Sequence, residues 1–227
     1  MSWLTNFLLS SIGRKVIMSL TGIFLILFLT VHLIGNLQLL KGDGGEAFNI
    51  YADFMGHNPL IQTISIGNFF FIILHAIMGI LLWIKNKSAR GSRYAVQSKA
   101  STTYASRNMA WFGIIILAFI ILHLAQFWFR MKFTDIPEMA TYGDVEVKNL
   151  YDLVAATFSS LPFVVFYVIT MVVIGLHLNH GFQSAFQTLG LNHKKYTPII
   201  KGLGAGYSVI VPLGYSIIPI VFYLTKA

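Results

Sequence analysis

The sequence predicts an all-α membrane protein with five transmembrane helices, and three observations support this fold class. Only 11% of the 227 residues are charged and 56% are hydrophobic, whereas about 25% of the residues in a soluble domain are charged. The chain also contains five uncharged runs, each longer than the roughly 20 apolar residues that a membrane-spanning helix needs. Finally, basic and acidic residues are segregated between alternate loops. We therefore expect the lipid bilayer to surround most of the chain.

The five spans are expected at residues 15–40, 59–84, 107–130, 158–186 and 199–224. The fourth uncharged run, between Asp152 and Lys194, is long enough for two spans. Its second half contains many polar side chains, so we predict one helix with an amphipathic extension. Because the sequence has no internal repeat and no linker, residues 1–227 are predicted to form a single domain.

The distribution of charge predicts an N-terminus in the cytoplasm and a C-terminus outside. In this orientation, 11 of the 16 Lys and Arg residues lie in cytoplasmic segments, and all eight Asp and Glu residues lie in the two outer loops. Cytoplasmic loops are typically enriched in Lys and Arg. The net charge of +8 is then a topology signal, and without a nucleic-acid motif it does not indicate nucleic-acid binding. We expect a multi-pass protein of the cytoplasmic (inner) membrane, whose N-terminal apolar run is too long for a cleavable signal peptide.

Several cofactors are excluded or not indicated. The chain has no cysteine, which excludes disulfides, iron–sulfur ligation and covalent c-type haem attachment. No Gly-rich nucleotide fingerprint follows a strand pattern, so no flavin or nucleotide domain is predicted.

Four of the five spans carry a histidine near the middle of the membrane: His32, His75, His123 and His177. Ionisable groups at this depth are costly and are usually functional. With a rise of about 1.5 Å per residue, His32 and His123 lie roughly 6–7 Å from the midplane on the outer side. The second and fourth spans run in the opposite direction, which places His75 and His177 roughly 5 Å toward the cytoplasm. The four histidines therefore form an outer pair and an inner pair.

Two pairs of membrane histidines are suited to two b-type haems, each with two histidine ligands. Neutral imidazole is a good ligand for haem iron, and its second ring nitrogen then needs a hydrogen-bond acceptor. Gly35, Gly79 and Gly181 follow three of the histidines by about one helical turn, where a small residue leaves room for a porphyrin. A single membrane histidine can instead simply hydrogen-bond a neighbouring helix. A haem-free transporter with a histidine proton relay is the main alternative, although such relays usually include carboxylates, and the predicted spans contain none.

His180 complicates the assignment of the fourth ligand. It follows His177 by three residues, so both rings can face the same side of the helix. Depth favours His177, but the residues alone allow either histidine to be the ligand. His180 lies nearer the cytoplasmic boundary, where it could contact a haem propionate, a quinone or a partner.

Five segments carry a family resemblance over nearly the full length. They are SSIGRKVIMSLTGIFLILFLTVHLIGNLQ near the N-terminus, GGEAFNIYADFM before the second span, ILHAIMGI at His75, LHLAQ at His123 and GLHLNHGFQSAFQTLG at His177. In this combination the chain resembles the single-chain, dihaem cytochrome b subunit of succinate dehydrogenases and fumarate reductases. The resemblance implies that His32 and His123 hold one haem, and that His75 and His177 hold the haem nearer the catalytic subunits. It also selects His177 rather than His180.

The family resemblance further implies the partners and the electron path. A flavoprotein subunit would interconvert succinate and fumarate, and an iron–sulfur subunit would dock on the cytoplasmic face, where the basic loop from Lys85 to Arg107 is a candidate contact. Electrons would pass between the iron–sulfur subunit and a membrane quinone, usually menaquinone for the dihaem type. The candidates for the outer quinone site are Glu46, Asp53 and His57. Some fumarate reductases carry a glutamate just before the ligand of the fourth span, but Gly175 stands in that region here.

Haem propionates are expected near cationic side chains at the span ends. The inner candidates are Arg14, Lys15 and Arg93, with His180 nearby, and the outer candidate is Arg130. An alternative partner for the same two haems is another respiratory complex, of the hydrogenase or formate dehydrogenase type.

Overall fold

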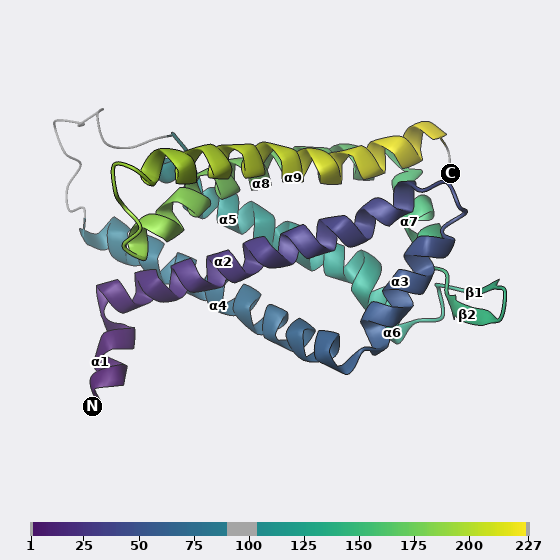
Figure 1. The fold of residues 1–227 in the computed structure, drawn as a ribbon, viewed down its shortest axis with the longest axis horizontal. Helices are drawn as coiled ribbons and strands as arrows, with labels where there is room; N and C mark the ends of the chain where they lie inside the picture. The colour runs from purple at the N-terminus through teal and green to yellow at the C-terminus, as the bar shows by residue number, and fades with distance from the viewer. Residues whose placement is uncertain (1, 90–103, 226–227) are drawn as a thin grey trace.

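The computed structural model describes residues 2–89 and 104–225. These residues include five helices that are long and apolar enough to cross a membrane: Ser11–Leu40, Pro59–Ser88, Ala105–Phe133, Leu161–Thr188 and Thr197–Thr225. The five helices lie along the long axis of the molecule (Figure 1). The prediction of a helical protein with five helices that could span a membrane is therefore confirmed.

The first two spans are longer than predicted. A short helix, α1 (Trp3–Leu9), precedes α2 (Ser11–Asn36), which continues into the 3-10 turn η1 (Leu37–Leu40). The helix α2 begins at Ser11 because the side chain of Ser10 caps it, accepting a hydrogen bond from the Gly13 N–H at 2.9 Å. The helix α4 (Pro59–Ala89) continues past Lys85 and Lys87. A change from apolar to charged residues marks the edge of a bilayer and not the end of a helix.

The third and fourth spans differ from the prediction at their ends. The helix α5 (Tyr104–His123) is followed by a π-helical segment, η2 (Leu124–Phe129), and by α6 (Arg130–Phe133). The fourth span is one helix, α8 (Leu161–Thr188), which begins three residues later than expected. Residues before it form a separate helix, α7 (Leu150–Phe158), and Pro162 stands in the first turn of α8, where its missing N–H is not needed. The last span is α9 (Thr197–Thr225).

A small cap that the sequence did not predict covers one end of the bundle (Figure 1). It consists of α3 (Glu46–His57), α7, and an antiparallel hairpin of β1 (Met139–Tyr142) and β2 (Val145–Lys148). Asn49 of α3 is only 1% exposed and connects these elements. Its Nδ2 donates to the Tyr142 hydroxyl at 2.9 Å and to Asn149 Oδ1 at 3.0 Å, and its Oδ1 accepts from the Tyr151 N–H at 2.9 Å.

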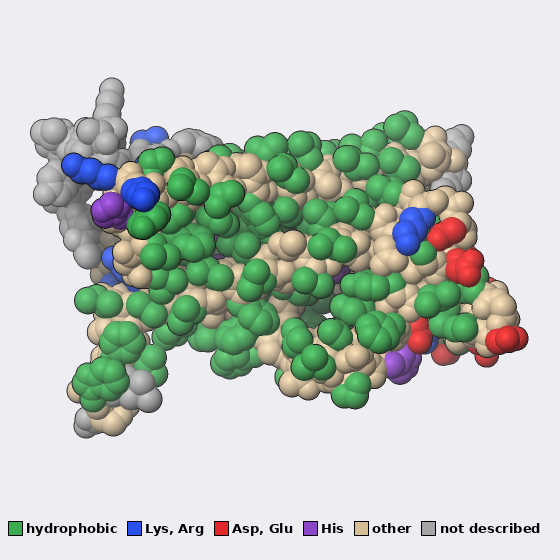
Figure 2. Space-filling view, in the orientation of Figure 1, with side chains coloured by type: hydrophobic (Ala, Val, Ile, Leu, Met, Phe, Trp, Pro, Cys, Tyr) green, Lys and Arg blue, Asp and Glu red, His purple; other side chains and the backbone are tan. Residues whose placement is uncertain are grey.

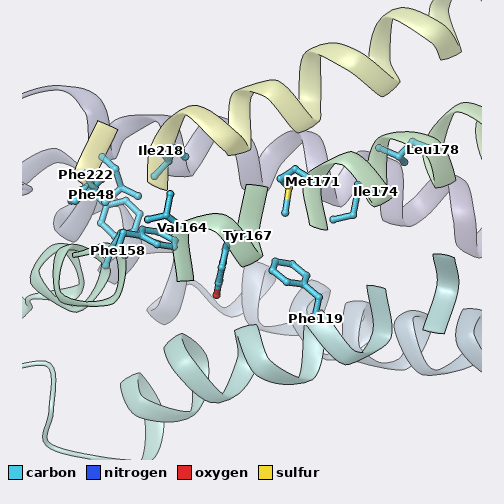
Figure 3. Packing of buried hydrophobic residues seen from close by; sticks show 12 residues of the cluster. Phe48, Phe119, Phe158, Val164, Tyr167, Met171, Ile174, Leu178, Ile218 and Phe222 are labelled. Carbon is cyan, nitrogen blue, oxygen red and sulfur yellow. The ribbon is translucent and has the colours of Figure 1, made fainter. Parts of the chain in front are cut away.

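The main hydrophobic core lies along α8, which packs between α9 and α5 (Figure 3). Close approach of α8 and α9 depends on Gly175, where a Cβ atom would lie 2.8 Å from the Ser208 carbonyl oxygen. The helix α9 is also held to α2, because the hydroxyls of Tyr207 and Tyr215 donate to the carbonyls of Ile26 and Leu29. The α8 helix is therefore in contact with helices on several sides, and it carries Tyr167 and His177.

The charged side chains lie mainly at the two ends of the bundle (Figure 2). Acidic side chains gather at the end that carries α3, α7 and the hairpin. Lys and Arg side chains are concentrated at the end that carries α1, although a few lie at the acidic end. The long sides between the two ends are mostly hydrophobic, which suits a lipid environment.

Candidate functional site

The four membrane histidines lie in two pairs inside the bundle. The ring centroids of His32 on α2 and His123 on α5 are 6.0 Å apart, and the two ring planes are perpendicular. The ring centroids of His75 on α4 and His177 on α8 are 6.3 Å apart, at an interplanar angle of 68°. The structure thus brings together the two pairs that depth and the family resemblance predict. That the pairs bind haem stays a prediction.

The spacing within each pair fits a metal between two imidazoles. The bond from an imidazole nitrogen to a transition metal is about 2 Å long, so two rings on opposite sides of one ion have centres roughly 6 Å apart. Within residues 2–89 and 104–225, no group of three or more His, Cys, Asp or Glu side chains is placed to hold a metal ion. A haem differs from such a site because the porphyrin supplies the remaining bonds to the iron, so two histidines are sufficient.

Contacts between helices give the distance between the two pairs. On α2, Thr21 contacts His75, and His32 lies eleven residues further along, which corresponds to roughly 16 Å. On α8, Tyr167 contacts His123, and His177 lies ten residues further along, or roughly 15 Å. The distances measured along α2 and along α8 agree, so the two histidine pairs lie at two separate levels of the bundle.

The His75–His177 pair is flanked by small and hydroxyl-bearing residues. The Nδ1 atom of His75 lies 3.1 Å from Oγ1 of Thr21. A Cβ atom at Gly22 would lie 3.4 Å from Cε1 of His75, and one at Gly113 would lie 4.0 Å from Cε1 of His177. These two glycines, one on α2 and one on α5, leave room at the edges of the rings. Neither was singled out from the sequence, because they lie on different helices from the histidines that they contact.

The three glycines that the sequence analysis did single out, Gly35, Gly79 and Gly181, have different surroundings from Gly22 and Gly113. The space next to Gly35 is filled by Tyr51 of α3, whose Cε1 would lie 2.6 Å from an added Cβ atom. Gly35 therefore permits packing of α3 against α2, and the expectation that it leaves room for a porphyrin is wrong. Gly79 faces Met18 at 3.4 Å, and an added Cβ at Gly181 has no neighbour within 4 Å among the residues described.

The His32–His123 pair lies in an aromatic environment. Phe28 stacks on His32 with a centroid distance of 5.3 Å, and Phe119 stacks on His123 at 5.7 Å. The hydroxyl of Tyr167 lies 3.4 Å from Nδ1 of His123 and donates to Oε1 of Gln126 at 2.5 Å. In Figure 3 the Tyr167 side chain points from α8 toward α5.

Two buried polar atoms have no hydrogen-bond partner among the residues that the structure describes: Nδ1 of His177 and Oδ1 of Asn68. Asn68 is 7% exposed and lies on α4, two helical turns before His75. Buried polar groups nearly always have a partner in the protein, in water or in a ligand. These orphaned atoms therefore fit a bundle that holds a polar or metal-bearing group, and the sequence reasoning missed Asn68.

The quinone-site candidates all lie on α3, in the cap at the acidic end. Glu46 lines an open groove of about 510 Å³ together with Asp43, Ile50 and Phe54. Asp53 and His57 do not line this groove. Instead, Nδ1 of His57 lies 3.1 Å from Oδ1 of Asp53 in an exposed i,i+4 pair, and such surface pairs contribute little to stability.

The other candidates lie at the ends of the spans. Arg14 and Lys15 stand near the start of α2, about 10 Å along the helix from Thr21 and the His75 level. Arg130 lines a cavity of about 140 Å³ with Gln126, two helical turns beyond His123. His180 is partly buried on α8, one turn beyond His177. Arg93 lies outside the described residues.

Comparison with protein-family models, with curated proteins and with solved structures gave no match to this chain.

Proposed function

We propose that the chain is a dihaem cytochrome b, the membrane anchor and electron-transfer subunit of a succinate:quinone oxidoreductase. The observation that carries the proposal is the pair of histidine contacts, with ring centroids 6.0 Å and 6.3 Å apart at two levels of a membrane bundle. Four histidines on four helices, arranged as two opposed pairs, match the requirement of two haems with two axial ligands each.

The residues that would hold the haems follow from these pairs. His32 and His123 would ligate one iron, and His75 and His177 the other. A haem supplies one-electron transfer, which the side chains of the chain cannot perform themselves. The protein fixes the ligands, and Phe28 and Phe119 stack on the His32–His123 pair, where they would help to exclude water.

The charge distribution supports an orientation with the basic end in the cytoplasm and the acidic end outside (Figure 2). In this orientation the N-terminus is cytoplasmic, and the His75–His177 pair is nearer the cytoplasm. The proposed flavoprotein and iron–sulfur subunits would dock on the basic end, so electrons would pass through the His75–His177 haem and then the His32–His123 haem. The complex would thereby link succinate oxidation in the tricarboxylic acid cycle, or fumarate reduction, to the membrane quinone.

The proposed quinone site lies at the acidic end, near the His32–His123 pair. The groove beside Glu46 combines a carboxylate with the apolar side chains of Ile50 and Phe54, as binding of an apolar quinone with a polar head group requires. Reduction of a quinone consumes protons, and oxidation of a quinol releases them, so a carboxylate at this boundary is chemically suitable. Menaquinone is the expected substrate by resemblance to the family.

The packing of Gly175 gives a physical reason why no glutamate stands at this position of α8. Because a Cβ atom there would lie 2.8 Å from the carbonyl oxygen of Ser208, a glutamate at this position would push α9 away from α8. Helix packing in this chain therefore disfavours a glutamate at position 175.

Purification of the chain from its native membrane tests the proposal. We expect a reduced b-type absorption band and co-purification of a flavoprotein with succinate dehydrogenase or fumarate reductase activity. Recovery with a hydrogenase or a formate dehydrogenase would keep the haems but contradict the assigned complex. Purified, correctly folded protein without a haem band would favour the proton-relay transporter instead.

A further inference from the structure

One ring in each histidine pair has its Nδ1 atom beside a hydroxyl group. Nδ1 of His75 lies 3.1 Å from Oγ1 of Thr21, and Nδ1 of His123 lies 3.4 Å from the hydroxyl oxygen of Tyr167. A hydroxyl donates one proton and accepts at its lone pairs. The partner that receives the hydroxyl proton therefore determines which tautomer of the histidine the site favours.

The hydroxyl group of Thr21 donates its proton to backbone carbonyls of its own helix. Oγ1 of Thr21 lies 2.8 Å from the carbonyl oxygen of Ile17 and 3.1 Å from that of Met18. Carbonyl oxygens only accept hydrogen bonds, so the hydroxyl donates to them and presents a lone pair to His75. The Nδ1 atom of His75 must then carry the proton, which leaves its Nε2 atom without one.

The hydroxyl group of Tyr167 likewise donates its proton, in this case to a side chain. The hydroxyl donates to Oε1 of Gln126 at 2.5 Å, and the side chain of Tyr167 is only 6% exposed. Gln126 belongs to the π-helical segment η2, which begins directly after His123. Such segments are rare and occur frequently at functional sites. The lone pair of Tyr167 therefore faces His123 and favours the same tautomer, with the proton on Nδ1.

Among the residues that the structure describes, the other two histidines have no hydroxyl acceptor of this kind. Nδ1 of His177 has no partner among the described residues. His32 has the amide nitrogen of Asn36 at 3.4 Å from both ring nitrogens, and an amide nitrogen only donates. Each pair thus contains one ring with a fixed tautomer and one ring without.

We propose that Thr21 and Tyr167 are positioning residues, which hold one ligand of each haem with Nδ1 protonated and Nε2 free to bind iron. The inference rests on the proposed binding of two haems. A hydrogen bond donated by Nδ1 makes an imidazole a more basic ligand, and a more basic ligand stabilises ferric over ferrous iron. Each hydroxyl therefore lowers the midpoint potential of its own haem and leaves the other haem unaffected.

Thr21→Val tests the inference at the His75–His177 pair, because it removes the hydroxyl with little change in shape. We expect a positive shift in the midpoint potential of one haem and changed EPR g-values for that haem. We also expect the affinity for haem at that site to fall by about tenfold or more. Thr21→Ser keeps the hydroxyl and should behave as wild type. If Thr21→Val protein does not accumulate, Thr21→Ala supplies the same measurement. His75→Ala, which should lack this haem, assigns the two potentials.

Tyr167→Phe is the corresponding variant at the His32–His123 pair and should shift the potential of the other haem only. Tyr215→Phe is the matched control, because the Tyr215 ring lies 6.0 Å from the His32 ring while its hydroxyl donates to the Leu29 carbonyl. The inference is overturned if both potentials are unchanged in Thr21→Val and Tyr167→Phe proteins that retain two haems. It is also overturned if the control shifts the potential as much as Tyr167→Phe. A wild-type protein without haem would instead contradict the proposed function itself.

Discussion

Replacing Asn49 by Ala should destabilise the cap at the acidic end of the bundle. The side chain is 1% exposed. It donates two hydrogen bonds, to Tyr142 and Asn149, and accepts one from the backbone N–H of Tyr151. Because these partners lie in β1, in the N-cap of α7 and in α7 itself, the substitution removes the polar connection between three elements at once.

The magnitude follows from these three hydrogen bonds. A buried hydrogen bond contributes about 1 kcal/mol to the free energy of unfolding, so the loss of three costs about 3 kcal/mol. Alanine has a higher helix propensity than asparagine, which offsets about 0.5 kcal/mol. A net loss of about 2.5 kcal/mol lowers the melting temperature of a chain of this size by roughly 5–10 °C.

Thermal unfolding of the purified protein in detergent, followed by intrinsic fluorescence, measures this effect. Asn179→Ala is the matched control, because Asn179 is exposed on α8 and, among the described residues, its side chain accepts one hydrogen bond, from Gln183 at 3.2 Å. The control should stay within about 0.5 kcal/mol of wild type. If Asn49→Ala melts at the same temperature as Asn179→Ala, the assigned role of Asn49 is wrong.

Three further predictions concern the site. His75→Ala or His177→Ala should leave one haem per polypeptide while His180→Ala keeps both, as a pyridine haemochrome assay would show; loss of a haem in His180→Ala alone would reverse the choice of ligand. Gly175→Leu should lower the melting temperature because its Cβ would lie 2.8 Å from a carbonyl oxygen of α9, with overpacking costs of about 1–3 kcal/mol; unchanged melting would contradict the tight contact. Glu46→Gln should slow quinol turnover with both haem spectra intact, and wild-type turnover would remove Glu46 from the quinone site.

The spans could be predicted from the sequence because a long uncharged run has few alternatives to a membrane helix. The histidine pairs followed from helix direction and rise, and the contacts of His32 with His123 and of His75 with His177 agree with that arithmetic. Their surroundings could not be predicted in the same way. Thr21 and Tyr167 lie on different helices from the rings that they contact, and sequence spacing says nothing about such neighbours.

The cap was missed for a different reason. Its elements are short, and α3, α7 and the hairpin are stabilised by contacts such as that between Asn49 and Asn149, which lie 100 residues apart in the sequence. The role of Gly35 was misjudged because its neighbour, Tyr51, belongs to this unpredicted cap. Local patterns indicate which residues are small or polar, but tertiary contacts decide what each of them faces.

The number of haems bound per polypeptide tests the central claim most directly. The purified wild-type protein should contain two b-type haems per chain by pyridine haemochrome assay, with both irons low-spin and ligated by two histidines in EPR spectra. A folded protein with no haem, or with one haem only, would contradict the assignment of two ligand pairs.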